Sequence, residues 1–248
     1  MRFRLRLSIC QLLACVVVLL PVVAQAQSAP INLAFVLPKA SAAAAHDGLS
    51  QSGKIAYDGG VLGVGALVAS DDKGIYRTIQ GPNGPSKGES RIANAVTKLG
   101  DLTYVAPALG LLYATGGTEN RDLAWRSGLA VVRAGAIGIT LKEIIGRKRP
   151  DGADGGSDDS FHPLKPSSER YDSFPSGHTL VAFAVGTVWA DERPSERYEA
   201  YGLATAVGLS RIVKRAHWPS DVFWGAVIGI TQARQAIKGN ANLLTVRF

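Results

Sequence analysis

Three short segments of the chain combine residue types that can do chemistry with a predicted helix boundary. The first begins at Lys142, near the end of a predicted apolar helix, and closes with Arg149 and Pro150. Proline cannot continue a helix, so Pro150 marks a stop behind a dense group of cations. We interpret Arg147 and Lys148 as side chains that only favour the negative end of the helix dipole. Lys142 and Arg149 are candidate anion-binding residues.

The second segment reads Phe174-Pro175-Ser176-Gly177-His178-Thr179 and leads directly into an apolar helix. Free backbone N–H groups at a helix start form an anion site, and a glycine lets a ligand approach the backbone. His178, in the first turn, can act on whatever binds there. Taken alone, the same residues are an ordinary helix cap in most proteins.

The third segment reads Ser210-Arg211-x5-His217-x3-Asp221, with Pro219 opening a new helix. Arg211 stands in the last turn of the preceding predicted helix, and His217 lies in the turn between the two helices. A carboxylate four positions after a histidine can hold its ring N–H and so fix its tautomer. The other ring nitrogen of His217 then becomes a stronger nucleophile or base.

Together the three segments supply two histidines, one carboxylate and at least three cations over the 80 residues from Lys142 to Asp221. They offer no cluster of carboxylates or cysteines that would hold a metal. Metal-independent phosphoryl transfer needs cations around the phosphoryl oxygens, a nucleophile in line and an acid on the leaving oxygen. The sequence therefore predicts a phosphoryl-transfer enzyme without a cofactor, in which vanadate could bind as a mimic of phosphate.

The three segments resemble the signature motifs of the type 2 phosphatidate phosphatase superfamily, and every signature position is filled. That superfamily includes lipid phosphate phosphatases, class A acid phosphatases and vanadium haloperoxidases. The resemblance implies an all-α bundle and a phosphohistidine intermediate. It also implies a role for each residue: phosphate binding by Lys142, Arg149, Ser176, Gly177 and Arg211, nucleophilic attack by His217, orientation of His217 by Asp221, and protonation of the leaving alkoxide by His178.

The elements that must position these residues are helices, because strand-type alternation is scarce and no internal repeat occurs. We expect an all-α bundle of about six or seven helices, similar to the acid phosphatases and haloperoxidases, in one domain over residues 53–240. Gly225-x-x-x-Gly229 lets helix backbones approach closely. The expected helices span residues 53–69, 91–99, 101–115, 119–145, 176–191, 195–213 and 219–237, with a loosely ordered segment at 27–52, a connection at 71–90 and a surface tail at 241–248.

The first 26 residues have the pattern of a secretory signal peptide. Three arginines precede an apolar run over residues 7–23, and Ala24-Gln25-Ala26 is a small-x-small cleavage site. Cleavage would lower the net charge from +7 to +4 by removing those arginines, and would also remove Cys10 and Cys15. We therefore expect a thiol-free protein in the periplasm or another extracytoplasmic space, with too small a positive excess to bind nucleic acid.

The composition argues against a disordered chain and against a packed multi-span membrane protein. Hydrophobic residues make up 46% of the chain and charged residues 19%, with a mean hydropathy of +0.10. A membrane-crossing helix needs about 20 apolar residues. The runs at 59–70, 179–190 and 222–233 have only 12 residues each, and Pro107 interrupts the longest uncharged stretch. We expect a soluble or peripheral bundle with some membrane contact, and keep short spans in a thin membrane as an alternative.

The segment 151–173 between the first two motifs is rich in Gly, Asp and Ser. Its aspartates, Asp151, Asp154, Asp158 and Asp159, do not follow the order of a calcium loop. We interpret the segment as a solvated lid over substrate entry. Phe161, His162 and Lys165 are expected near its mouth, and no catalytic role is assigned to His46 or His162.

Three function classes follow from these observations. The leading one is an exported phosphatase for phosphomonoesters, including lipid phosphates. Aromatic residues near the motifs favour a lipid substrate, although core packing explains them equally well: Phe174, Trp218, Phe223 and Trp224. The second is a vanadium haloperoxidase, for which the chain without its leader looks short. The third is a catalytically inert envelope protein, which the complete motifs disfavour.

Overall fold

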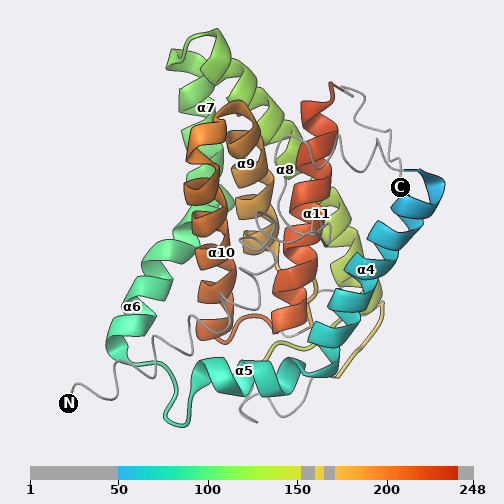
Figure 1. The fold of residues 1–248 in the computed structure, drawn as a ribbon. Helices are drawn as coiled ribbons and strands as arrows, with labels where there is room; N and C mark the ends of the chain where they lie inside the picture. The colour runs from blue at the N-terminus through green and yellow to red at the C-terminus, as the bar shows by residue number, and fades with distance from the viewer. Residues whose placement is uncertain (1–49, 152–159, 165–170, 240–248) are drawn as a thin grey trace. The chain divides into compact units, whose positions relative to one another are not determined.

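The computed structural model describes residues 50–151, 160–164 and 171–239 of the chain. Over these ranges it holds eight α-helices, α4 to α11, and two short 3-10 helices (Figure 1). Within the same ranges, the β-type pairing is a single antiparallel bridge between Arg147 and Phe161. The predicted all-α class is confirmed. The predicted leader, most of the segment 27–52 and the tail 241–248 lie outside the described residues.

The described residues 50–82 belong to one compact unit, which contains α4 (Gln51–Ser70) and α5 (Asp72–Gln80). Helix α4 begins where the Ser50 hydroxyl accepts a hydrogen bond from the N–H of Gly53 at 3.2 Å. The predicted connection over residues 71–90 is wrong at α5, whose nine residues lie inside it. Gly81 ends α5 with a φ of 66°, a conformation that glycine adopts without steric cost.

Residues 83–248 form a second compact unit, which contains all three predicted motifs. Helix α6 begins earlier than predicted because Ser86 and Glu89 form a capping box, with hydrogen bonds of 2.7 and 3.2 Å. The later helices agree with the predicted ranges within two residues, and the single domain over 53–240 stays a prediction. The elements are α6 (Lys87–Val96), η2 (Thr97–Gly100), α7 (Leu102–Thr115), α8 (Thr118–Ile145), α9 (Gly177–Glu192), η3 (Pro194–Glu196), α10 (Arg197–Val213) and α11 (Pro219–Ile237).

Helix α9 lies at the centre of this second unit and packs against α8, α10 and α11 (Figure 1). Leu180 and Val188 of α9 are fully buried in the main hydrophobic cluster. Helix α11 approaches α9 so closely that a Cβ on Gly229 would stand 2.5 Å from the Leu180 carbonyl oxygen. A Cβ on Gly225 would stand 2.7 Å from the Ser176 carbonyl oxygen. The predicted close approach at the two glycines is confirmed.

The ends of α8 and α10 and the starts of α9 and α11 meet at one end of the bundle. The N–H of Ser176, just before α9, donates to the carbonyl oxygen of Asp221 in α11 at 3.0 Å. The N–H of Ser173 donates to the carbonyl oxygen of Arg147, just after α8, at 3.0 Å. This end of the bundle therefore brings the three sequence motifs together.

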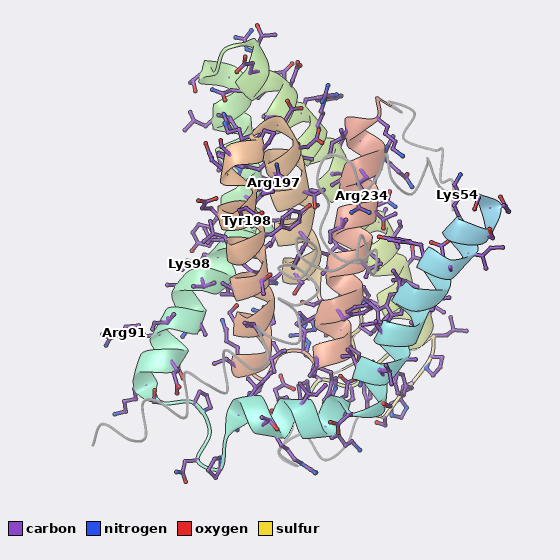
Figure 2. The ribbon with its side chains drawn as sticks, in the orientation of Figure 1. Lys54, Arg91, Lys98, Arg197, Tyr198 and Arg234 are labelled. Atoms are coloured by element: carbon purple, nitrogen blue, oxygen red, sulfur yellow. The ribbon has the colours of Figure 1, made fainter. Side chains whose placement is uncertain are left out.

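The outer surface of the second unit carries both charged and large apolar side chains. Arg91 on α6 and Tyr198 on α10 project away from the helix axes (Figure 2). In the part of the chain that the structure describes, no helix is both long and apolar enough to cross a membrane.

Candidate active site

The predicted phosphate-binding cations Lys142 and Arg149 are held together by Asp172, a residue that the sequence did not single out. The ammonium group of Lys142 donates to the backbone carbonyl oxygen of Asp172. The guanidinium of Arg149 donates to both carboxylate oxygens of Asp172, at 2.6 and 2.8 Å. Burial favours the neutral acid, but the bonds and charge of Arg149 lower the pKa of Asp172 below its ordinary value. Asp172 therefore fixes the two cations as a pair.

Arg211, the third predicted cation, is buried in the last turn of α10. One of its terminal nitrogens donates to the Thr97 hydroxyl at 2.8 Å, while its Nε is buried without a hydrogen-bond partner among the described residues. Burial and the nearby Arg149 lower the pKa of Arg211 to about 10. Burial also lowers the pKa of Lys142 to about 8, with Arg149 contributing against the opposing effect of Asp172. A bound anion would relieve this crowding of positive charge.

The start of α9 adds backbone donors to this group of cations. Ser176 is the N-cap residue, but its hydroxyl pairs with the Thr179 hydroxyl at 2.8 Å, and no side chain caps the helix. The space into which a Gly177 Cβ would project is empty to 4 Å. An anion can therefore reach the first N–H groups of α9, as the sequence predicts.

His217, the predicted nucleophile, is buried, with 2% of its surface exposed. Its Nδ1 lies 2.7 Å from the backbone carbonyl oxygen of Ser173, an acceptor that requires a proton on Nδ1. That tautomer leaves the lone pair on Nε2. Burial lowers the pKa of His217 to about 4, against the opposing effect of Asp221. The imidazole is thus neutral at neutral pH and has the form that a nucleophile needs.

Asp221 lies close to His217 but does not bind its ring directly. Its Oδ2 is 3.7 Å from Nδ1 of His217, too far for the hydrogen bond that the spacing predicts. Asp221 instead accepts from the Ser173 hydroxyl at 2.5 Å, from the Trp218 N–H at 2.9 Å and from the Arg147 guanidinium at 2.8 Å. Burial favours its neutral form, but His217 and Arg147 lower its pKa below the ordinary value.

Arg147 has a different place from the one predicted. The interpretation of this residue as a cation that only favours the helix dipole is wrong, because its side chain is buried and pairs with Asp221. Its guanidinium also donates to the Ser220 hydroxyl at 2.7 Å. A helix C-terminus rich in basic residues does not reveal which of them turns inward.

His178, the predicted general acid, stands in the first turn of α9 with 30% of its side chain exposed. Its Nε2 lies 3.9 Å from a carboxylate oxygen of Asp101, the N-cap residue of α7. Burial and the charge of Arg211 lower the pKa of His178 to about 4, and Asp101 opposes them. The ring is therefore neutral at neutral pH when no anion is bound. A bound phosphate would raise its pKa and favour the protonated form that an acid needs.

The described parts of the predicted lid are attached to the end of α8. The N–H of His162 donates to the carbonyl oxygen of Gly146 at 2.7 Å, and the ring of His162 contacts that of Tyr171 edge-on. Phe161 is half exposed and lies 5.4 Å from the Arg147 guanidinium. Lys165, Asp154, Asp158 and Asp159 lie outside the described residues, and the gating role stays a prediction. Within the described ranges, no group of three His, Cys, Asp or Glu side chains could hold a metal.

A helical bundle that gathers these motifs at one end has a counterpart among known families. Residues 123–241 match the family model described as the PAP2 superfamily. The predicted resemblance to the type 2 phosphatidate phosphatase superfamily is confirmed.

Individual relatives match shorter parts of the chain. A lipid A 1-phosphatase of Porphyromonas gingivalis is 32% identical over 139 residues, which cover 54% of this chain but only 29% of that relative. A non-specific acid phosphatase of Salmonella typhimurium is 35% identical over 60 residues, 24% of each chain. The crystal structure of Aquifex aeolicus LpxE superposes with a TM-score of 0.52 at 26% identity, covering 66% of this chain and 93% of that one.

Proposed function

We propose that the chain is a phosphatase that hydrolyses phosphomonoesters without a metal, through a phosphohistidine. The observation that carries this proposal is the buried, neutral His217. Its Nδ1 is engaged by a backbone carbonyl, and Lys142 and Arg149 are close enough to lower its pKa. The names of two relatives, lipid A 1-phosphatase and non-specific acid phosphatase, support the same reaction class.

In the first step, the phosphoryl oxygens of the ester lie among Lys142, Arg149, Arg211 and the N–H of Gly177. Nε2 of His217 attacks phosphorus, and the bond between phosphorus and the ester oxygen breaks. The electron pair stays on the leaving oxygen, which takes a proton from His178. The cations stabilise the charge that spreads over the phosphoryl oxygens in the transition state.

In the second step, water attacks the phosphohistidine and the bond between Nε2 and phosphorus breaks. His178, now neutral, takes a proton from the water, as microscopic reversibility requires of the former acid. Inorganic phosphate leaves, and His217 returns to its neutral tautomer.

The substrate class that we propose is a phosphate carried by a lipid at a membrane surface. The relatives of this chain include a lipid A 1-phosphatase of Porphyromonas gingivalis. Helix α7 has no charged residue and no buried one, although it packs on α8. Tyrosine and tryptophan suit the boundary between lipid and water. Large apolar or aromatic side chains at least half exposed on α7 and α8 include Leu102, Tyr104, Leu111, Tyr113, Trp125, Val132 and Ile139.

Membrane contact can be tested by sedimentation with vesicles of zwitterionic and anionic phospholipids. We expect the protein to sediment with vesicles, and Leu111→Glu and Trp125→Glu together to release it without loss of soluble-ester hydrolysis. Unchanged sedimentation of this variant, or a concentration-dependent dimer that the variant abolishes, would overturn the lipid assignment.

Export, which rests on the predicted leader, is tested by fractionating cells that express the full chain.

The phosphatase proposal is tested with p-nitrophenyl phosphate, phosphatidate and lipid A as substrates. We expect His217→Ala to abolish turnover of all three, and acid-quenched wild-type enzyme to carry an acid-labile phosphate. His46→Ala, a histidine outside the motifs, is the matched control. Full activity of the His217→Ala variant would contradict the proposal.

A further inference from the structure

The ring of His217 is held at Nδ1 by one atom, the backbone carbonyl oxygen of Ser173, at 2.7 Å. Ser173 is itself fully buried. Its hydroxyl donates to Asp221 at 2.5 Å, and its N–H donates to the Arg147 carbonyl oxygen at 3.0 Å. Two of the three contacts of Ser173 therefore lead to Arg147, one directly and one through Asp221.

We propose that Arg147 is a positioning residue for the nucleophile, which it holds in the Nδ1–H tautomer by fixing Asp221 and Ser173 behind the ring. This proposal rests on the proposed function, because it assigns His217 as the nucleophile. Arg147 does not belong to the phosphate-binding group. A terminal nitrogen of its guanidinium lies 2.8 Å from Oδ1 of Asp221, whereas the Ser173 hydroxyl donates to Oδ2.

The contacts of Arg147 require a guanidinium. The group donates to both Ser220 and Asp221, and lies 5.3 Å from the Trp218 ring and 5.4 Å from the Phe161 ring. The delocalised guanidinium lies near two aromatic rings while one of its terminal nitrogens donates both hydrogen bonds, an arrangement that the compact ammonium group of lysine reproduces only in part. Trp218 is fixed in turn, because its indole N–H donates to the Lys148 carbonyl oxygen at 2.8 Å.

The charge of Arg147 also decides what Asp221 can do. Asp221 is completely buried, and a buried carboxylate without a cation takes up a proton. The protonated acid would have to donate one hydrogen bond, whereas all of its present contacts donate to it. The neutral acid would accept the hydrogen bond of the Ser173 hydroxyl more weakly than the carboxylate does, so the Ser173 carbonyl would be fixed less firmly against Nδ1 of His217.

The direct measurement is the tautomer of His217 by nitrogen-15 NMR at neutral pH, in the full chain. We expect a proton on Nδ1 in the wild type, and a mixture with the Nε2–H tautomer in Arg147→Gln. Because misplacing a reacting group by about 1 Å can cost about 100-fold in rate, kcat for p-nitrophenyl phosphate should fall by that order while KM changes by less than about threefold. Arg147→Lys should recover only part of kcat.

Arg193→Gln is the matched control. Arg193 also stacks on an indole ring, that of Trp189, 4.3 Å away, and donates to Asn120 at 2.6 Å, but it stands just after the far end of α9. This control should lose thermal stability without a change in the His217 tautomer or in kcat. Should Arg147→Gln fail to fold, Ser173→Ala provides the same test, with a smaller loss in kcat and the same mixture of tautomers.

A folded Arg147→Gln or Ser173→Ala variant that keeps both the Nδ1–H tautomer and the wild-type kcat would overturn the inference. A fall in activity with an unchanged tautomer would also overturn it. Failure of the phosphatase proposal is distinguishable, because an inactive wild-type protein would still report its His217 tautomer by NMR.

Discussion

Replacing Lys142 with arginine separates the charge of this side chain from its ability to titrate. Lys142 is the one phosphate-binding cation of the three whose pKa, about 8, lies within a convenient assay range. Above pH 8 Lys142 loses its positive charge when no anion is bound, whereas arginine keeps its charge throughout that range. We therefore expect the wild-type enzyme, but not Lys142→Arg, to bind phosphate more weakly as the pH rises above 8.

The magnitude follows from the lowered pKa. The shift of the Lys142 pKa from 10.5 to about 8 means that the pocket disfavours the protonated amine by roughly 3 kcal/mol. A phosphate dianion beside Lys142 removes much of that penalty, and linkage requires the protonated amine to favour phosphate equally. If the whole shift is reversed, Kd rises about tenfold per pH unit between pH 8 and 10.5. Because half of the amines are already neutral at pH 8, the expected increase between pH 8 and 9.5 is about 15-fold.

The assay is isothermal titration of the protein with inorganic phosphate from pH 7 to 9.5. Phosphate is mainly a dianion above pH 7.5, so its own ionisation changes little in the window that matters. Lys87→Arg, at an exposed lysine of α6, is the control and should follow the wild type. A wild-type Kd that stays constant from pH 7 to 9.5, or a Lys142→Arg variant that loses affinity in parallel with it, would refute the reasoning.

Three further predictions follow from the site. His178→Ala should slow hydrolysis of alkyl phosphates by about 10²- to 10⁴-fold but that of p-nitrophenyl phosphate far less, because nitrophenolate leaves without an acid; equal losses in kcat for both esters would contradict the role. Vanadate should inhibit competitively and EDTA should leave activity unchanged in initial-rate assays, since cationic side chains supply the positive charge; strong loss with EDTA would argue for a metal. His217 has a folded pKa of about 4, below the ordinary 6.5, so the unfolded chain binds the proton first and stability is lost as the pH falls through this window. Chemical denaturation at pH 7 and pH 4.5 measures how far the free energy of unfolding falls between these two pH values. We expect this fall to be up to about 3 kcal/mol smaller in His217→Asn than in the wild type, and equal falls would contradict the prediction.

The sequence by itself determined the helical class, most helix boundaries and the motifs of the site. Pro219 locates the start of α11 because its fixed φ suits the first helical position. Helix periodicity locates the end of α8 at Ile145, where Gly146 takes the left-handed conformation with a φ of 55°, four residues before Pro150. The predicted connection over residues 71–90 was wrong because its Gly and Pro residues are turn signals, yet α5 includes Gly74 and ends just before Gly81 and Pro82. The capping box of Ser86 and Glu89 was a readable local signal for the start of α6.

Only the tertiary structure decided how the site is held together. Asp172 joins Lys142 and Arg149 across an intervening segment of more than 20 residues, which no local pattern encodes. Ser173 holds His217 through a backbone carbonyl, and every residue type carries that group. Sequence spacing could name Asp221 as a partner of His217, but the geometry that separates them by 3.7 Å comes from packing.

Arg147 shows the same division between sequence and structure. Sequence places it in a basic cluster beside Lys148 and Arg149, where three cations of the same type are locally equivalent. Burial under Trp218 and the charge of Asp221 select it alone for the interior. The residue types and their order thus determined the reaction class that we propose, whereas the choice of inward-facing partners depended on helices brought together from distant parts of the chain.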